Sequence, residues 1–96
     1  MLGTNVRVGP FELDVVARDH DTIVVVEVRT RGAGAWEGAF ASMGPRKRQR
    51  VRAGGERLWR ERYGGDPSLQ RMRFDAASVS FGSSGEPCVE YAVGAF

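Results

Sequence analysis

Three acidic side chains occupy strand-like stretches where a buried sheet would normally carry apolar residues. Glu12 and Asp14 lie in FELDVVAR and Glu27 lies in TIVVVEVRTR, two segments rich in valine. Side chains alternate across a strand, so Glu12, Asp14 and Val16 are expected to share one face of the first segment. Leu13 and its alternate neighbours would form an apolar face on the other side.

The pairing of the two segments decides whether their carboxylates meet. A two-residue turn between them places Asp14 opposite Glu27. The same register places Glu12 opposite Arg29. A register shifted by two residues pairs Glu12 with Glu27 instead and keeps the same side chains on the same face. In either register the sequence predicts acidic side chains that converge.

Opposed carboxylates on neighbouring strands need something to offset their repulsion, because their Cβ atoms lie about 5 Å apart. A cation, a proton on a carboxyl group with a raised pKa, or counter-ions such as Arg18 and Arg29 would each serve. Asp14 and Glu27 suit Mg²⁺ or Mn²⁺, which bind carboxylate oxygens, a backbone carbonyl and water. Such an ion activates water and neutralises phosphate charge, the chemistry of a nuclease. The alternative is a solvated outer face in which Glu12 pairs with Arg29.

Strands and one helix must position these side chains. Valine-rich and threonine-rich segments predict three strands, joined by a Gly-Pro turn and a polar turn. A Gly-Pro pair predicts the start of a helix, and a Gly-Gly pair in its middle indicates a bend or a close backbone approach. The predicted strands are residues 5–8, 11–18, 22–31, 71–81 and 87–93, the helix spans about 44–63, and residues 32–43 form a loop. The order βββαββ predicts one α+β domain, residues 1–96, in which a sheet packs against a helix.

Composition narrows the class of protein. The chain has 96 residues, 42% hydrophobic and 27% charged, which is typical of one globular domain. No apolar run approaches the roughly 20 residues of a membrane helix and no signal peptide is evident, so we expect a cytoplasmic protein. The single Cys88 cannot close an intrachain disulfide and is expected to fill a small space in the core. The lone His20 is expected to be a solvated turn residue.

Positive charge is concentrated in the predicted helix. Eight of the fourteen basic residues lie between Arg46 and Arg62, and nearly all are arginine, whose guanidinium binds phosphate oxygens in pairs. This block predicts contacts with a nucleic-acid backbone, or else a solvated helix face. Trp36 and Phe40 would stack on an unpaired base or fill the edge of the core. The residues expected to bind DNA are Arg46, Lys47, Arg48, Arg50 and Arg52.

The stretch FELDVVARDHDTIVVVEVRTR resembles the GE(I/L)D…ARD.DTLVFVEV(K/R)TR core of the YraN family, small bacterial proteins of unassigned biochemical role. The likeness continues through GPRK, RFDAASV and VEYAVGAF, so it covers nearly the whole chain. The YraN family is in turn similar to the PD-(D/E)XK nuclease superfamily and to archaeal Holliday junction resolvases. The resemblance implies a restriction-endonuclease-like βββαββ core, with a mixed sheet packed against a helix.

The resemblance also implies roles for individual residues. Asp14 takes the place of the superfamily's aspartate, and Glu27 takes that of its second acidic residue. Arg29 stands where the E-x-K motif has lysine. Glu12 matches the acidic residue of the family's GE(I/L)D signature, and Lys47 matches its helix lysine. By this resemblance Asp14 and Glu27 hold the metal ion, while Glu12 and Arg29 complete the catalytic site.

Three departures from the family pattern bear on catalysis. The family usually begins with a helix that carries its own glutamate near the active site, and this chain starts just after the expected end of that helix. Phe11 stands where the family has glycine. Arg29 stabilises charge on a phosphate but remains protonated, so it cannot serve as a base. These departures put catalysis in doubt more than phosphate binding.

These observations predict a Mg²⁺- or Mn²⁺-dependent endonuclease-like protein that acts on DNA phosphodiesters, branched DNA included. The alternative is a nuclease-like fold that has lost its chemistry and serves as a DNA-binding or assembly module, which the absent helix glutamate favours. A third hypothesis is a small structural domain with no nucleic-acid partner. Sheet and core surface left uncovered without the first helix would predict a homodimer.

Overall fold

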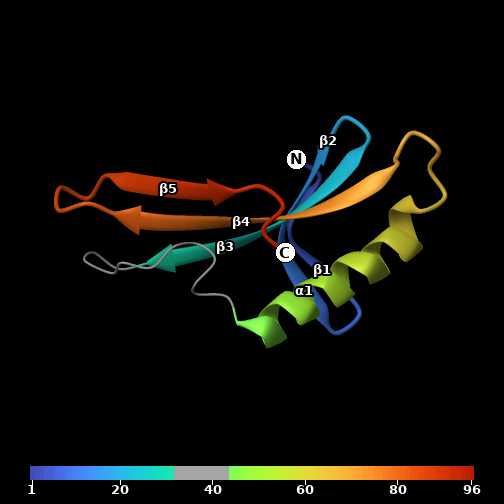
Figure 1. The fold of residues 1–96 in the computed structure, drawn as a ribbon, viewed down its shortest axis with the longest axis horizontal. Coiled ribbons are helices and arrows are strands. Elements are labelled where there is room, and N and C mark those ends of the chain that lie inside the picture. The colour runs from blue at the N-terminus through green and yellow to red at the C-terminus, as the bar shows by residue number, and fades with distance from the viewer. Residues whose placement is uncertain (32–43) are drawn as a thin grey trace.

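The computed structural model describes residues 1–31 and 44–96 of the chain. In this part of the chain a five-stranded sheet carries a helix on one side (Figure 1). The elements are β1 (Gly3–Val8), β2 (Phe11–Asp19), β3 (Thr22–Arg31), α1 (Pro45–Leu58), the π-helical turn η1 (Trp59–Tyr63), β4 (Arg71–Phe81) and β5 (Pro87–Ala92). The predicted order βββαββ is confirmed, and the predicted strand ends are correct to within two residues. The predicted loop at 32–43, with Trp36 and Phe40, lies outside the described residues.

The sheet is mixed, as predicted. Its strand order is β1-β2-β3-β4-β5, and only the β3–β4 pair is parallel among these neighbours. Parallel strands cannot be joined by a tight turn, so the chain passes through α1 between β3 and β4. This crossover places α1 across one face of the sheet, and β3, β4 and β5 extend past its first turn (Figure 1).

The hairpin between β2 and β3 has a two-residue turn that begins at His20. Paired residues run from Val15–Val26 to Asp19–Thr22. The predicted register is therefore confirmed, and the register shifted by two residues is wrong. His20 is exposed and has a φ of +55°, in the left-handed region that L-residues adopt mainly in turns, which fits the solvated turn position predicted for it.

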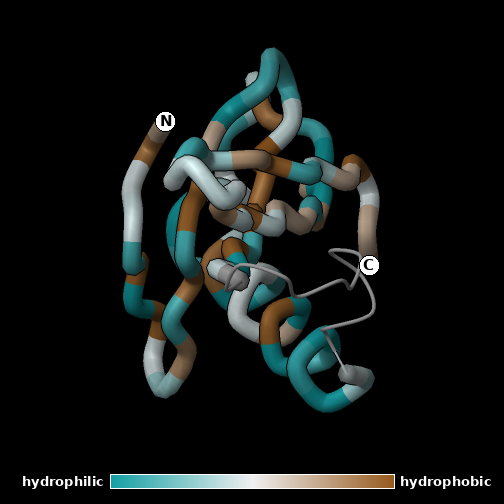
Figure 2. Tube along the Cα trace, turned by 90° about the vertical axis from the view of Figure 1, so that its left-hand side faces the viewer, coloured by the Kyte–Doolittle hydropathy of each residue, from teal (hydrophilic) through white to brown (hydrophobic). Residues whose placement is uncertain are grey.

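The main core lies between the sheet and α1. A smaller apolar cluster on the opposite face joins Val24 and Val26 of β3 to Ala77 of β4, with Val15 of β2 packed beside it. Figure 2 shows that the first turns of α1 are almost entirely hydrophilic, so the helix contributes to the core mainly through its later turns. The buried members of the main core are Val8, Leu13, Val16, Ile23, Val25, Val51, Leu58, Leu69 and Phe74.

Strand β2 departs from strict alternation at Asp14. Leu13 and Val16 both lie in the core under α1, although side chains three apart on a regular strand point to opposite faces. Across from Asp14 on β1, Asn5 has a φ of +48°, in the left-handed region. The pairing of β2 with β3 also ends beside Asp14, at Val15. The predicted division of β2 into an acidic and an apolar face is therefore wrong, because the distorted strand places Val16, predicted on the acidic face, in the core with Leu13.

Helix α1 begins at Pro45, as predicted, because the fixed φ of proline suits the first helical turn. It ends at Leu58 and continues as η1, whose last turn is closed by a hydrogen bond from the Gly64 N–H to the Trp59 carbonyl. The predicted helix thus has nearly its predicted length, with a widened final turn.

The glycine pair in the middle of α1 marks a close approach of the helix to the sheet. A Cβ atom on Gly54 would lie 2.9 Å from Cβ of Phe11 on β2. A Cβ atom on Gly55 would collide with the ring of Phe74 on β4. The close backbone approach predicted for these glycines is confirmed, and it fixes how α1 sits on two strands at once.

The outer surface brings one correction. Cys88 lies exposed on β5 and does not fill the core, because β5 is an edge strand whose residues are nearly all exposed. Among the described helices, none is long and apolar enough to cross a membrane.

Replacement of Gly54 by alanine tests the close approach. Overpacking typically costs about 1–3 kcal/mol, whereas alanine gains only up to about 1 kcal/mol in helix propensity. We therefore expect Gly54→Ala to lower the free energy of unfolding, measured by urea denaturation. Gly65→Ala is the control, since nothing lies within 4 Å of a Cβ atom at Gly65. Unchanged stability of Gly54→Ala would contradict the packing.

Candidate functional site

Asp14 and Glu27 meet where β2 and β3 separate. The Val28 N–H donates to Oδ2 of Asp14 at 2.9 Å, and the Asp14 N–H donates a long hydrogen bond of 3.4 Å to Oε2 of Glu27. Each carboxylate thus takes the place of a strand-pairing partner just beyond the last regular pair of the hairpin. The predicted convergence of Asp14 and Glu27 is what the described geometry shows.

Glu27 is buried beneath the first turn of α1. Its side chain is 2% exposed, and Nζ of Lys47 lies 3.1 Å from its Oε1. Pro45 starts the helix two residues earlier, so the helix start places this lysine above β3. The alternative of a solvated outer face is therefore wrong for Glu27, which points into the space between sheet and helix.

The environment of Glu27 favours its protonated form. Burial raises the pKa of its carboxyl group above the ordinary value, and the charge of Asp14 raises it further. The hydrogen bond and charge of Lys47 oppose this rise without cancelling it. A buried carboxyl group beside a second carboxylate is an arrangement that a bound cation would relieve.

Around these groups lies a polar cavity of about 360 Å³. Arg29 lines this acidic cavity together with Asp14, Glu27, Val28 and Lys47. Mg²⁺ usually takes one or two protein carboxylates and keeps several waters, so two carboxylates and open space suit it. No cluster of three or more His, Cys, Asp or Glu side chains that would enclose a metal occurs in the described part of the chain. The site therefore fits an ion that shares its ligands with water and substrate.

Glu12 lies apart from the acidic cavity. It forms an exposed ion pair with Arg7 of β1, at 3.6 Å, and lines a separate small hollow with Phe11 and Arg50. The predicted Glu12–Arg29 pair is wrong, because regular pairing of β2 with β3 ends at Val15 and the strands then diverge. Lys47 lines both hollows and is the residue that links them.

The basic residues predicted to bind DNA point in several directions around α1. Lys47 contacts Glu27, as described above. Arg50 reaches the β1–β2 side, where its guanidinium lies 5.3 Å from the ring centre of Phe11. Arg52 reaches the opposite side of the helix, 4.9 Å from the ring centre of Phe74. Arg46 and Arg48 precede them in the first turn. These residues thus surround the helix and do not form one continuous row.

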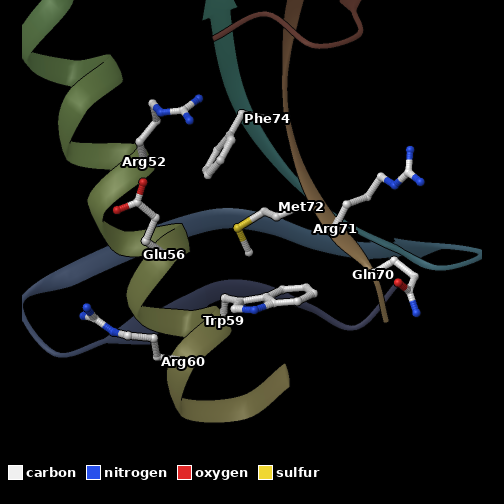
Figure 3. A pocket seen from close by; sticks show the side chains of 8 residues that line it. All are labelled: Arg52, Glu56, Trp59, Arg60, Gln70, Arg71, Met72 and Phe74. Atoms are coloured by element: carbon white, nitrogen blue, oxygen red, sulfur yellow. The ribbon is translucent and has the colours of Figure 1, made fainter. Parts of the chain in front are cut away.

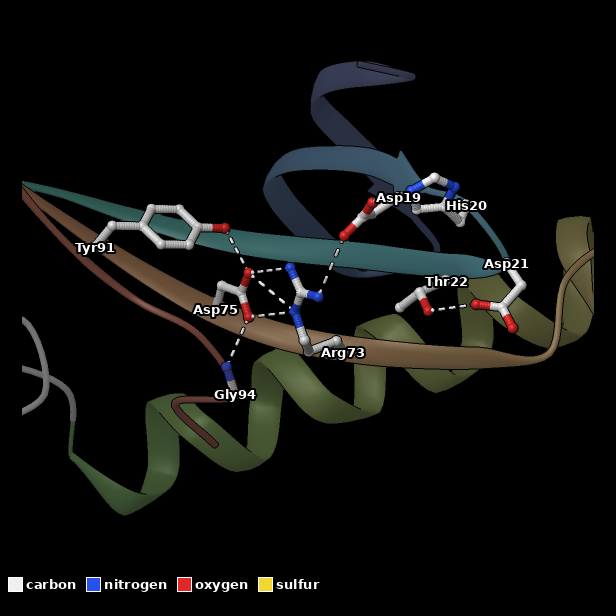
Figure 4. Close-up of polar contacts among 8 residues, drawn as sticks. All are labelled: Asp19, His20, Asp21, Thr22, Arg73, Asp75, Tyr91 and Gly94. Atoms are coloured by element: carbon white, nitrogen blue, oxygen red, sulfur yellow. Dashed lines mark hydrogen bonds and ion pairs between the residues drawn. The ribbon is translucent and has the colours of Figure 1, made fainter.

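A second buried carboxylate escaped the sequence predictions. Asp75 of β4 is fully buried on the sheet face opposite α1 and accepts hydrogen bonds from three residues (Figure 4). Its donors are the guanidinium of Arg73 at 3.0 Å, the Tyr91 hydroxyl at 2.5 Å and the Gly94 N–H at 2.8 Å. An acidic residue inside the apolar stretch FDAAS, two positions after an arginine, was the signal that would have revealed it.

The Asp75 network has a structural role. Burial would raise the pKa of Asp75, but the hydrogen bonds from Arg73, Tyr91 and Gly94 outweigh it and lower the pKa. Burial and the neighbouring carboxylate raise the pKa of Tyr91 to about 12. With its acceptors occupied, Asp75 joins β5 and the C-terminal segment to β4 and leaves no open position for a ligand.

Residues 1–79 match the family model described as uncharacterised protein family UPF0102. The chain belongs to this family. UPF0102 is the family of the YraN proteins, so the resemblance seen in the sequence is confirmed at this level.

Several UPF0102 proteins are similar along most of the chain. A UPF0102 protein of Sorangium cellulosum is 53% identical over 96 residues, which cover 100% of this chain and 67% of the relative. One from Streptomyces coelicolor is 43% identical over 83 residues, covering 86% of this chain and 62% of the relative. One from Anaeromyxobacter dehalogenans is 42% identical over 96 residues, covering 100% and 69%. The chain spans about two thirds of the length of these relatives.

Glu27→Gln tests the protonation of the acidic cavity in this UPF0102 chain. A raised pKa means that the folded protein binds this proton more tightly than the unfolded chain, so Glu27 costs stability as pH rises above 4.5. Glutamine does not ionise. We expect the stability of Glu27→Gln relative to the unaltered chain to increase between pH 4 and pH 8, measured by urea denaturation with a chelator present. The matched control is Glu90→Gln, at an exposed carboxylate on β5. A stability difference for Glu27→Gln that does not change with pH would refute the raised pKa of Glu27.

Asp75→Asn tests the second carboxylate. Removing one partner of a buried ion pair costs about 3–5 kcal/mol, whereas loss of the Tyr91 hydroxyl in Tyr91→Phe should cost about 1–3 kcal/mol. Because the pKa of Asp75 is lowered, its contribution is present above pH 3.8 and disappears as pH falls through the lower folded value. Thermal unfolding at pH 7 and pH 3 would show this loss. Equal stability of Asp75→Asn and the unaltered chain at pH 7 would rule out this structural role of Asp75.

Proposed function

We propose that this UPF0102 chain is a nuclease-like domain that acts on DNA phosphodiesters with a divalent metal ion. The observation that carries the proposal is the buried Glu27 beside Asp14, with the Lys47 ammonium 3.1 Å away, in an open polar cavity. A globular domain gains little stability from burying one carboxylate beside a second, so the arrangement is best explained by a ligand that needs both.

Mg²⁺ or Mn²⁺ is the ion that suits this donor set. Both are hard cations that bind carboxylate oxygen and water, and Asp14 and Glu27 would hold the ion. When bound, such an ion polarises water for attack and neutralises charge on the scissile phosphate. Its binding requires the ionised carboxylate, so metal affinity should rise with pH as Glu27 loses its proton.

The remaining side chains of the acidic cavity have distinct roles in this proposal. Arg29 lines the cavity and keeps its positive charge, so it would hold the phosphate and stabilise charge in the transition state. Lys47 fixes the orientation of the Glu27 carboxylate through their contact. Glu12 lies outside the acidic cavity, so we assign it no catalytic part in this arrangement.

The likeness to PD-(D/E)XK nucleases supports the same proposal. Asp14, Glu27 and Arg29 stand at the positions of that superfamily's acidic pair and lysine. The two acidic residues lie on adjacent antiparallel strands, followed by a helix and a parallel strand. A restriction-endonuclease-like core, branched DNA as substrate and a homodimer belong to the proposal, and the exposed Tyr91 on edge strand β5 is compatible with self-association.

A second candidate function is a DNA-binding or assembly module without catalysis. Arg29 in place of lysine favours it, since arginine cannot act as a base. The described residues also supply only a pair of carboxylates to the acidic cavity, with Glu12 turned toward Arg7. This alternative predicts salt-sensitive DNA binding that is indifferent to divalent ions.

Cleavage of linear and branched DNA in Mn²⁺ tests the proposal. We expect cutting by the unaltered chain and a loss of at least about 100-fold in Glu27→Ala, because metal-site residues act on the chemical step. Glu61→Ala removes an exposed carboxylate on η1, at the opposite end of the helix from Lys47, and should cut normally. Calorimetry should show that Asp14→Ala loses Mn²⁺ binding while its circular dichroism stays folded.

Two results would change the conclusion. If no DNA is cut but binding remains and weakens with salt, the non-catalytic module is the better account. If Asp14→Ala binds Mn²⁺ as tightly as the unaltered chain, the metal assignment is refuted whatever the cleavage result.

A further inference from the structure

A second hollow lies between α1 and β4, on the side of the helix that faces away from β2. We call it the α1–β4 groove, and it has a volume of about 490 Å³ (Figure 3). Its apolar lining comes from Trp59, Met72 and Phe74, and its basic lining comes from Arg52, Arg60 and Arg71. Among the described residues, none lines both this groove and the acidic cavity.

The floor of the groove is apolar and aromatic because of how η1 and β4 meet. The widened turn of η1 carries Trp59 across the end of the helix toward the start of β4, as Figure 3 shows. Met72 lies between this indole and the ring of Phe74. Trp59 and Met72 are only partly buried, whereas Phe74 is held in the main core. The groove therefore offers a firmly anchored floor with flat, partly open surfaces.

The rim of the groove carries surplus positive charge. In the part of the chain that the structure describes, three arginines line it against one acidic residue, Glu56. Within residues 1–31 and 44–96, Arg52 and Arg60 have no ion-pair partner. Arg71 makes only a long contact of 3.9 Å with Asp21, and both side chains are largely exposed, so it contributes little and is easily exchanged.

The aromatic floor and the cationic rim of the groove together indicate which kind of ligand it would bind. We infer that the α1–β4 groove binds a nucleotide unit, with its base on the floor near Trp59 and Met72 and its phosphate at the arginine rim. Stacking on an aromatic side chain is open to every base, and guanidinium groups bind phosphate oxygens in pairs. The carboxylate of Glu56 and the amide of Gln70, which also line the groove, supply hydrogen-bonding partners for a base edge.

Arg52 is the residue best placed to hold the phosphate. Its guanidinium already lies 4.9 Å from the centre of the Phe74 ring, which orients it over the groove without neutralising its charge. A phosphate bound there would meet a cation that has been brought into position before the ligand arrives. A purely apolar ligand would leave this charge uncompensated, and a bare phosphate would leave the floor uncovered.

This inference goes beyond the proposed cleavage of DNA, and nucleotide binding in the groove does not require that cleavage. Lys47 lies in the first turn of α1, and the groove is lined from Arg52, five residues and about 8 Å further along the helix, to Arg60. The groove thus lies along the later turns of the helix, beyond the acidic cavity. If both sites act on one strand, the groove holds a neighbouring nucleotide and not the phosphate that is cut.

Tryptophan fluorescence tests the inference directly. The chain has two tryptophans, so a Trp36→Phe background leaves Trp59 as the only indole. We would titrate this protein with thymidine monophosphate, thymidine, inorganic phosphate and a short single-stranded oligonucleotide. We expect the nucleotide to quench Trp59 with an affinity at least about tenfold tighter than thymidine or phosphate alone. Binding should be the same with a chelator present.

Matched charge variants locate the binding. Arg52→Gln should weaken nucleotide binding at least about fivefold, whereas Arg62→Gln, on η1 but outside the groove lining, should leave it unchanged. Both residues are exposed, and circular dichroism would confirm that each variant is folded. Glu27→Ala should bind the nucleotide normally, so failure of the proposed nuclease and failure of the groove remain distinguishable.

Each outcome decides the inference. Tighter binding of the oligonucleotide than of the mononucleotide would support the groove as a site for a strand, and equal binding would support a free nucleotide. No quenching at millimolar nucleotide would overturn the inference. So would equal losses in Arg52→Gln and Arg62→Gln, which would indicate non-specific charge, or phosphate binding as tightly as the nucleotide.

Discussion

The burial of Glu27 beside Asp14 is the constraint on which the rest of the structure depends. A carboxylate that is 2% exposed must find donors, and here they come from the Asp14 backbone and the Lys47 ammonium. The first contact requires β2 to stay beside β3 as far as Asp14, and the second requires α1 to start directly above β3. One buried side chain thereby holds Asp14 of β2 and Lys47 of α1 in place against β3.

Helix α1 connects this constraint to the remainder of the fold. Its first turn reaches the acidic cavity, its middle rests on β2 and β4 through Gly54 and Gly55, and its last turns carry Trp59 to the start of β4. Arg50 and Arg52 leave the helix on opposite sides and lie against different aromatic rings. The same element therefore builds two hollows of different chemistry, one acidic and one aromatic with a basic rim.

The sequence predicted the elements and most of the register because these follow from local rules. Valine-rich strand segments, a two-residue turn at His20 and proline at the helix start depend on a few neighbouring residues, and all three were confirmed. The position of Glu27 beneath Lys47 follows from the crossover between parallel strands, which no local pattern contains. Spacing alone therefore left open whether Glu27 faces solvent or the helix.

The errors have equally specific causes. Strict alternation placed Val16 on the acidic face, opposite Leu13, but both lie in the core because the left-handed backbone at Asn5 and the end of pairing at Asp14 accompany a distortion of β2. Cys88 was expected inside because small apolar residues usually are, yet it lies on an edge strand. Asp75 was missed because its partners Arg73 and Tyr91 come together only through the pairing of β4 with β5.

The two adjacent glycines of α1 also limit which substitutions the contact between helix and sheet can accept. Neighbouring helix positions point about 100° apart, so Gly54 and Gly55 lock the helix against β2 and β4 in a single rotational setting. A helix in contact with both strands cannot rotate about its own axis to make room for a larger side chain between helix and sheet. A side chain added at either glycine would displace the helix that carries both Lys47 and Arg52, so these two positions affect both hollows although the hollows share none of the described residues.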